Sequence, residues 1–217
     1  MGMLARGVAA SAKSWGWRTG DTRKLFHVMI FTAAAGVRWF AGFGALIVFG
    51  VLVAGLVLGA VYRGPRSALF EALARPEDVP HRGWYVVIPL IATALGGVTA
   101  HLLGGRLGVV AFLVSGWGDA VGEPVGIRWG RHRYRILTRR GVACTRSWEG
   151  TFAVFGVSFL GAVVGLSLLG EAGGGLWGLS AMVALSATLI ETVSPHGWDN
   201  FTVPVAVIGT LLACGLS

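Results

Sequence analysis

The chain has 217 residues, of which 54% are hydrophobic and only 13% are charged, and its mean hydropathy is +0.71. Soluble domains of this length carry about a quarter charged residues, so too little polar surface is left here to cover a water-soluble globule. The net charge of +8 does not indicate a nucleic-acid partner, because the basic residues lie in short segments between apolar stretches. The composition therefore predicts a polytopic integral membrane protein embedded in a lipid bilayer.

Residues 1–24 contain five basic residues and no continuous apolar core, which excludes a cleavable signal peptide. We expect a cytoplasmic or interfacial N-terminal segment here, followed by a single transmembrane catalytic domain over residues 25–217. A spanning helix needs roughly 20 mostly apolar residues. The candidates are residues 25–37, 40–62, 84–104, 107–126, 150–170, 176–193 and 201–216.

These spans predict an all-α bundle of six to seven transmembrane helices. The first span is short and ends at Arg38, so it either tilts or pairs with the second span as a hairpin. With the N-terminus in the cytoplasm, 16 of the 18 Lys and Arg residues fall on that side, in residues 1–24, 63–83 and 127–149. Because cytoplasmic loops of membrane proteins carry this excess of positive charge, we predict a cytoplasmic N-terminus.

The fourth span contains two acidic residues near its end, Asp119 and Glu123, which share one helix face. Carboxylates inside a span are costly and usually mark a functional site. Since like charges at this spacing repel unless a cation neutralises them, and Mg²⁺ takes carboxylate oxygens, the pair predicts a metal site. A water-facing interfacial pair is the alternative. Glycines at every fourth position from Gly118 to Gly130 give the same helix a smooth face for close packing.

An arginine-rich loop follows and includes Arg131, Arg133 and Arg146. Guanidinium groups bind phosphate oxygens in a bidentate manner, so this loop beside candidate metal ligands favours a nucleoside triphosphate. Positive-inside topology and contact with anionic lipids would explain the same charges. Ser147 is expected to cap the fifth span, whose free N–H groups favour anions, and Glu149 is an acid in its first turn.

Two further polar groups lie at the same predicted end of the bundle, one opening the first span and one joining the last two spans. Their members are Arg23, Lys24, His27, His196, Asp199 and Asn200. Glu191 lies close by, inside the sixth span near its cytoplasmic end. The convergence of three polar groups on one membrane face favours a common site over separate interfacial residues.

Four short motifs occur in an order that resembles the CTP-dependent polyprenol kinase family. This family comprises dolichol, phytol and farnesol kinases and CTP-dependent diacylglycerol kinases, within a superfamily shared with the phosphatidate cytidylyltransferases. The motifs are Arg-Lys-x-x-His at 23–27, Gly-Asp followed by a Gly-x-x-x-Gly helix end at 118–126, Arg-Ser-x-Glu-Gly at 146–150 and Asp-Asn-x-Thr-Val-Pro at 199–204. Residues 176–200 contain no lysine, whereas cytidylyltransferases usually have a lysine-rich segment, so a kinase is favoured over CDP-lipid synthesis as the alternative.

The resemblance implies that the protein transfers the γ-phosphoryl group of CTP to the hydroxyl of a membrane lipid alcohol, with Mg²⁺ as cofactor. The lipid would be a polyprenol, phytol, farnesol or diacylglycerol, and the site would face the cytoplasm of a bacterial or archaeal cell. Oligomer formation stays open. An ion-coupled transporter is the alternative from another class, but its ionisable residues should lie near the membrane midplane.

The same resemblance assigns roles to residues of this sequence. Asp119 would hold Mg²⁺, with Glu123 or Asp199 as the second ligand. The nucleotide-binding residues would be Arg23, Arg131, Arg133, Arg146, Ser147, Glu149, Gly150, Asp199 and Asn200. The catalytic residues would be Asp119, Lys24, His27 and His196, and the acceptor of the alcohol proton is left open among His27, His196 and Asp119.

Overall fold

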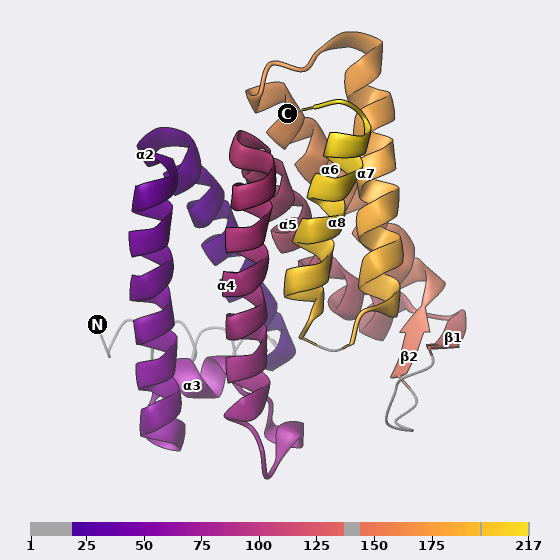
Figure 1. The fold of residues 1–217 in the computed structure, drawn as a ribbon. Helices are drawn as coiled ribbons and strands as arrows, with labels where there is room; N and C mark the ends of the chain where they lie inside the picture. The colour runs from indigo at the N-terminus through magenta and orange to yellow at the C-terminus, as the bar shows by residue number, and fades with distance from the viewer. Residues whose placement is uncertain (1–18, 137–143, 196, 217) are drawn as a thin grey trace.

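The computed structural model describes residues 19–136, 144–195 and 197–216 of the chain. This part of the chain is an almost entirely helical bundle (Figure 1). Its long helices are α2 (Thr19–Arg63), α4 (Trp84–Gly104), α5 (Gly108–Trp129), α6 (Trp148–Leu168), α7 (Gly173–Val193) and α8 (Asp199–Ala213). Four stretches are long and apolar enough to cross a membrane, and α8 is a shorter apolar helix. The predicted all-α membrane bundle is confirmed.

The helix α2 consists of two legs that meet at Gly42. This glycine has φ 85° and ψ −176°, a backbone conformation that residues with a Cβ rarely adopt, and the chain folds back there (Figure 1). The two legs correspond to the first two predicted spans, so these spans form a hairpin. The first leg begins at Thr19, and Arg23 and Lys24 therefore lie within a helix instead of ahead of one.

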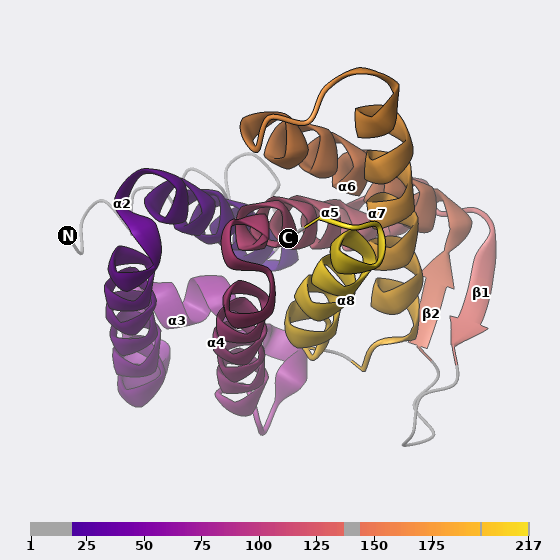
Figure 2. The ribbon, with the colours of Figure 1, turned by 45° about the horizontal axis from the view of Figure 1, so that its top comes forward.

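The helix α5 runs through the middle of the bundle, between the first leg of α2 and α6 (Figures 1 and 2). Its first half is buried, and Val110 and Val114 pack in one apolar core with Leu166, Val183 and Val207 of the neighbouring helices. Its glycine face lies directly against α6. A Cβ added to Gly122 would lie only 2.7 Å from Val154 Cγ2, which confirms the predicted packing role of these glycines.

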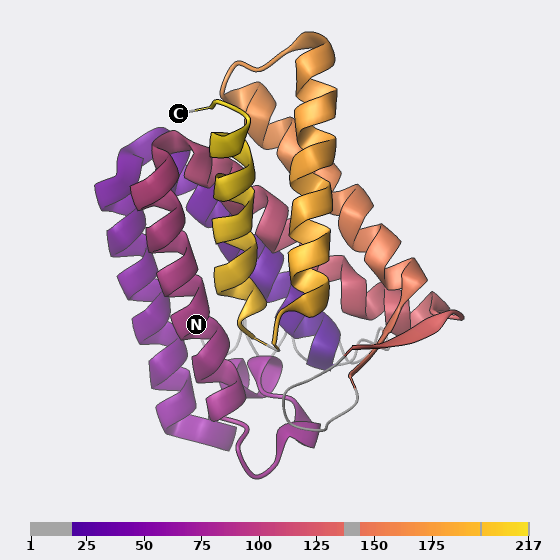
Figure 3. The ribbon, with the colours of Figure 1, turned by 45° about the vertical axis from the view of Figure 1, so that its right-hand side comes forward.

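A small β-hairpin precedes α6 and was not predicted. Its strands β1 (Arg133–Ile136) and β2 (Cys144–Ser147) are antiparallel, and Tyr134 lies opposite Arg146. The Tyr134 hydroxyl hydrogen-bonds Thr151 Oγ1 at 2.6 Å and so attaches the hairpin to the start of α6. The hairpin thereby brings part of the arginine-rich segment to one end of the bundle (Figures 1 and 3).

The polar connections gather at that same end. The short helix α3 (Ala68–Leu73), the hairpin and the link between α7 and α8 lie there, whereas the turn within α2 and the link between α6 and α7 lie at the opposite end (Figures 1 and 3). The chain therefore alternates between two ends, as expected for successive membrane crossings.

Candidate active site

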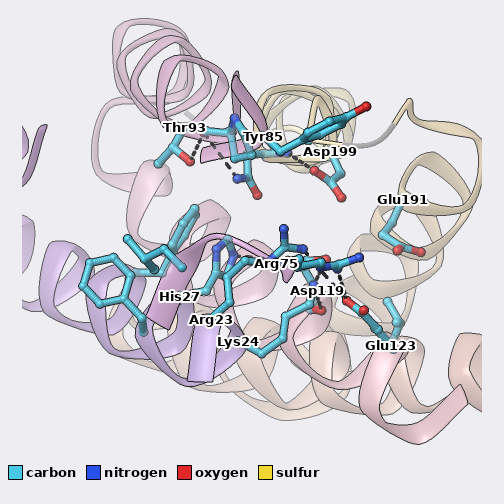
Figure 4. Close-up of a pocket in the computed structure, with 18 of the residues that line it drawn as sticks. Arg23, Lys24, His27, Arg75, Tyr85, Thr93, Asp119, Glu123, Glu191 and Asp199 are labelled. Carbon is cyan, nitrogen blue, oxygen red and sulfur yellow. Dashed lines mark hydrogen bonds and ion pairs between the residues drawn. The ribbon is translucent and has the colours of Figure 1, made fainter. Parts of the chain in front are cut away.

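A cavity of about 440 Å³ lies between α2, α4, α5 and the starts of α6 and α8. Such a volume suits a small-molecule ligand. Among the described residues, its polar lining consists mainly of charged side chains from the helices α2, α5, α7 and α8, the loop after α3 and the hairpin β1–β2 (Figure 4). These are Arg23, Lys24, His27, Arg75, Asp119, Glu123, Arg133, Arg146, Glu191 and Asp199. The structure thus brings together residues from all the polar groups that the sequence singled out.

Asp119 is held from one side by two residues of α2. Lys24 Nζ donates to Asp119 Oδ1 at 2.7 Å and to the main-chain oxygen of Asp119 at 2.8 Å. His27 Nε2 lies 3.5 Å from Asp119 Oδ2, and its ring stacks on Phe31. Because Lys24 and His27 are one helical turn apart, a single helix face presents both groups to the carboxylate.

Asp119 also has two acidic neighbours, Glu191 from α7 and Asp199 from the start of α8. One carboxylate oxygen of each lies within 4.8 Å of those of the other two. Carboxylates this close repel one another unless a proton or a cation neutralises them. The buried Glu191 Oε2 has no hydrogen-bond partner among the described residues. Three hard oxygen donors with an unsatisfied buried oxygen fit a divalent cation such as Mg²⁺.

Glu123 lies among arginines instead of in this acidic group. Arg75 Nη2 donates to Glu123 Oε2 at 2.7 Å, and Arg23 Nη2 lies 3.9 Å from the same oxygen. The reason is that α5 remains helical through Pro124, so Glu123 sits about 6 Å further along the axis than Asp119. The pairing of Asp119 with Glu123 as metal ligands therefore stays a prediction, and the geometry favours Glu191 and Asp199 as the partners of Asp119.

The start of α6 forms the opposite side of the cavity. Ser147 Oγ accepts a hydrogen bond from the Gly150 N–H at 3.1 Å, so the predicted helix cap is confirmed. Arg146 binds the Glu191 carboxylate, and its Nη2 also donates to the Glu191 main-chain oxygen at 2.9 Å. Gly150 and Asn200 line the cavity as well.

Two predicted site residues of the described structure, Arg131 and Glu149, do not line this cavity. Arg131 is exposed and lies outside the lining. Glu149 accepts a hydrogen bond from the ring of His132 at 2.8 Å instead of facing the cavity. His196 lies outside the described residues, so its predicted role stays a prediction.

Two charged residues of the cavity lining, Arg75 and Glu191, had been given no role by sequence reasoning. Arg75 was counted only as a positive charge of the 63–83 loop, and no local motif marks it. Glu191 did carry a signal, because a carboxylate inside an apolar span usually marks a functional site.

The fold and the cavity together define a polytopic membrane protein whose helices enclose a cavity lined by three neighbouring carboxylates and several basic side chains. The chain is 31% identical over 185 residues to a phytol kinase from Synechocystis sp., a match that covers 85% of this chain and 75% of the relative. No protein-family model matches the chain, and no solved structure matches it. The chain belongs to the CTP-dependent polyprenol kinase family and is therefore a kinase, as its motifs indicated.

Proposed function

We propose that the protein transfers the γ-phosphoryl group of CTP to the hydroxyl of a membrane isoprenoid alcohol of the phytol type. One observation carries this proposal: a single cavity joins a group of three carboxylates and several basic side chains to an apolar wall. A phosphate donor needs the charged part, and a lipid alcohol needs the apolar part. The similarity to a phytol kinase supports the isoprenoid class of acceptor.

Asp119, Glu191 and Asp199 are the residues that would hold Mg²⁺. Bound Mg²⁺ supplies neutralisation of the charge on the β- and γ-phosphates during transfer. The chain itself holds two of these carboxylates in place, since Lys24 forms an ion pair with Asp119 and Arg146 forms one with Glu191. The Lys24 ammonium and the Arg146 guanidinium lie beside these carboxylates, so each could also contact a phosphate oxygen that approaches the carboxylates.

Phosphoryl transfer depends mainly on positioning and on charge stabilisation, and arginines can provide both for a triphosphate. Arg23, Arg75, Arg133 and Arg146 line the cavity from four separate segments of the chain. We assign them to the triphosphate, because guanidinium groups bind phosphate oxygens in a bidentate manner. Arg23 and Arg75 face Glu123, whose carboxylate holds the two guanidinium groups near each other until the nucleotide binds.

His27 is our candidate for the group that accepts the proton of the alcohol. Its buried Nε2 has no hydrogen-bond partner among the described residues, and it faces Asp119 Oδ2 at 3.5 Å. Its neighbours Phe26, Ile30 and Phe31 line the apolar wall of the same cavity. A hydroxyl at the head of a lipid chain would therefore meet His27 where the apolar and charged walls join, and the Asp119 carboxylate would stabilise the imidazolium that forms when Nε2 takes the proton.

The site faces the cytoplasm in this proposal. The cavity's basic residues belong to segments that carry most of the chain's Lys and Arg, and such segments stay on the cytoplasmic side of membranes. CTP is available on that side.

The test follows two radioactive labels through one reaction. Purified protein in nanodiscs is incubated with phytol, Mg²⁺ and CTP that is labelled on either the γ- or the α-phosphate, with ATP and GTP as competing donors. We expect the γ-label, and not the α-label, to appear in the lipid. A parallel reaction offers phosphatidate, and transfer of the α-label to that lipid phosphate would identify CDP-lipid synthesis. Transfer of the γ-label to none of phytol, farnesol and diacylglycerol would overturn the proposed function.

A further inference from the structure

The apolar wall of the cavity is built by three helix faces that meet one another. The first leg of α2 contributes Phe26 and Ile30, its second leg contributes Val53 and Val57, and α4 contributes Val86 and Leu90. Each pair is spaced by four residues, which puts both members on the same side of their helix. The three faces enclose a single apolar chamber that is part of the same cavity as the carboxylates.

The chamber stays apolar even where a polar residue lines it. Thr93 of α4 belongs to the lining, but its hydroxyl donates to the main-chain oxygen of Pro89 at 2.8 Å (Figure 4). Its hydrogen-bonding capacity is therefore largely used within its own helix. A ligand portion without polar atoms suits such a wall, because it leaves no polar group unsatisfied.

The chamber leads away from the charged residues and into the bundle. Ile30 lies two turns beyond the level of Arg23 and Lys24 on the first leg of α2, which is about 10 Å along the helix axis. Val53 lies ten residues from the end of α2 at Arg63, or about 15 Å from the polar end. A chain that starts at His27 and follows these residues extends toward the membrane interior.

We propose that this chamber, between the two legs of α2 and α4, binds the isoprenoid chain of the acceptor and that Val53 and Leu90 limit the chain that fits. The inference rests on the proposed function for its substrate, but it adds a binding site and two specificity-determining residues. Both side chains are partly buried and line the cavity, Val53 from the second leg of α2 and Leu90 from α4. Their bulk sets the width of the passage, since an apolar channel discriminates mainly by shape.

Enlarging these side chains tests the passage. We expect Val53→Phe and Leu90→Phe to lower kcat/KM for phytol relative to geraniol by about tenfold, because overpacking excludes a long branched chain before a short one. Val51→Phe and Ile91→Phe are matched controls, since both residues lie on the same helices but are 65% and 46% exposed, outside the cavity. The controls should keep the wild-type ratio, and the melting temperatures of all four variants should be compared.

A phytol to geraniol ratio of kcat/KM that is unchanged in Val53→Phe and Leu90→Phe would overturn the assignment of these two residues, and so would an equal change in the controls.

A second measurement does not depend on turnover. An isoprenoid alcohol with a photoreactive diazirine in its tail is crosslinked to the wild-type protein, with and without excess phytol, and the labelled peptides are mapped by mass spectrometry. Phytol-competed labels on residues 26–30, 50–60 and 84–93 would support the chamber even if no phosphoryl transfer occurs, and labels only outside these three stretches would overturn it.

Discussion

Lys24 and Asp119 are 95 positions apart in the chain, yet Lys24 Nζ donates to both the carboxylate and the main-chain oxygen of Asp119. The side chain of Lys24 is 9% exposed and that of Asp119 is 17% exposed. This contact fixes the first leg of α2 against the middle of α5. It also leaves the second carboxylate oxygen of Asp119 directed at His27 and places the group beside Glu191 and Asp199.

Asp119→Asn should abolish turnover while the protein still inserts and folds. The amide keeps an oxygen that accepts the hydrogen bond from Lys24, but it lacks the charge that a metal and the His27 imidazole need. We expect kcat to fall by at least about a hundredfold, a typical loss when a charged group of a reaction centre is removed. Transfer of the γ-label measures activity, and the melting temperature reports folding. Wild-type activity in this variant would remove Asp119 from the site.

Glu191→Gln and Glu123→Gln separate the two candidate sets of metal ligands. If Asp119, Glu191 and Asp199 hold Mg²⁺, Glu191→Gln should raise the Mg²⁺ concentration for half-maximal activity by about tenfold or more. Glu123→Gln should leave that requirement close to wild type, because Glu123 contacts Arg75 and Arg23. Titration of activity with Mg²⁺ measures both variants, and the reverse result would support the pairing of Asp119 with Glu123.

Arg133→Ala and Arg131→Ala compare two arginines of one segment, of which only Arg133 lines the cavity. Loss of a guanidinium that binds the triphosphate should raise KM for CTP by about tenfold, which corresponds to one charge-assisted hydrogen bond. Arg131→Ala is the matched control and should keep the wild-type KM. Equal increases of the KM for CTP in the two variants would indicate a general electrostatic role of the segment. Such increases should disappear at high salt, because salt screens exposed charges.

Gly42→Ala should destabilise the protein by about 1–3 kcal/mol, because alanine is strained at the backbone angles of this turn. Gly44→Ala is the control: its added Cβ also meets open space, but Gly44 is not in a positive-φ conformation. The control should be neutral or stabilising, since glycine inside a helix costs stability. Thermal unfolding in detergent measures both. A stable Gly42→Ala variant would show that the turn does not need glycine.

The helices were predictable because apolar runs of spanning length leave little choice of structure in a membrane. The turn within α2 was visible as one of two options, since Arg38 ended the first run, but Gly42 could not be singled out among many glycines. The hairpin β1–β2 was missed even though Tyr134 and Ile136 alternate with Arg133 and Arg135. An alternation that contains only two apolar residues is too short to predict a strand within such an arginine-rich segment.

The site could be predicted only where its residues lie in local motifs. Lys24, His27 and Asp119 fall in such motifs, and the structure brings them into contact. Arg75 reaches the cavity from a loop that only the tertiary fold directs there. Glu123 shares a helix face with Asp119, as expected, but the rise along the helix gives it a different set of neighbours.

The contact between Lys24 and Asp119 also has a consequence for biosynthesis. The ribosome delivers α2 to the membrane before α5, so the ammonium group is already present when the Asp119 carboxylate enters the bilayer. An unpaired carboxylate is costly there, and an earlier helix that supplies its counter-ion lowers the barrier to insertion. Glu191 and Asp199 arrive last, with α7 and α8, so the three acids come together only after most of the chain has been synthesised.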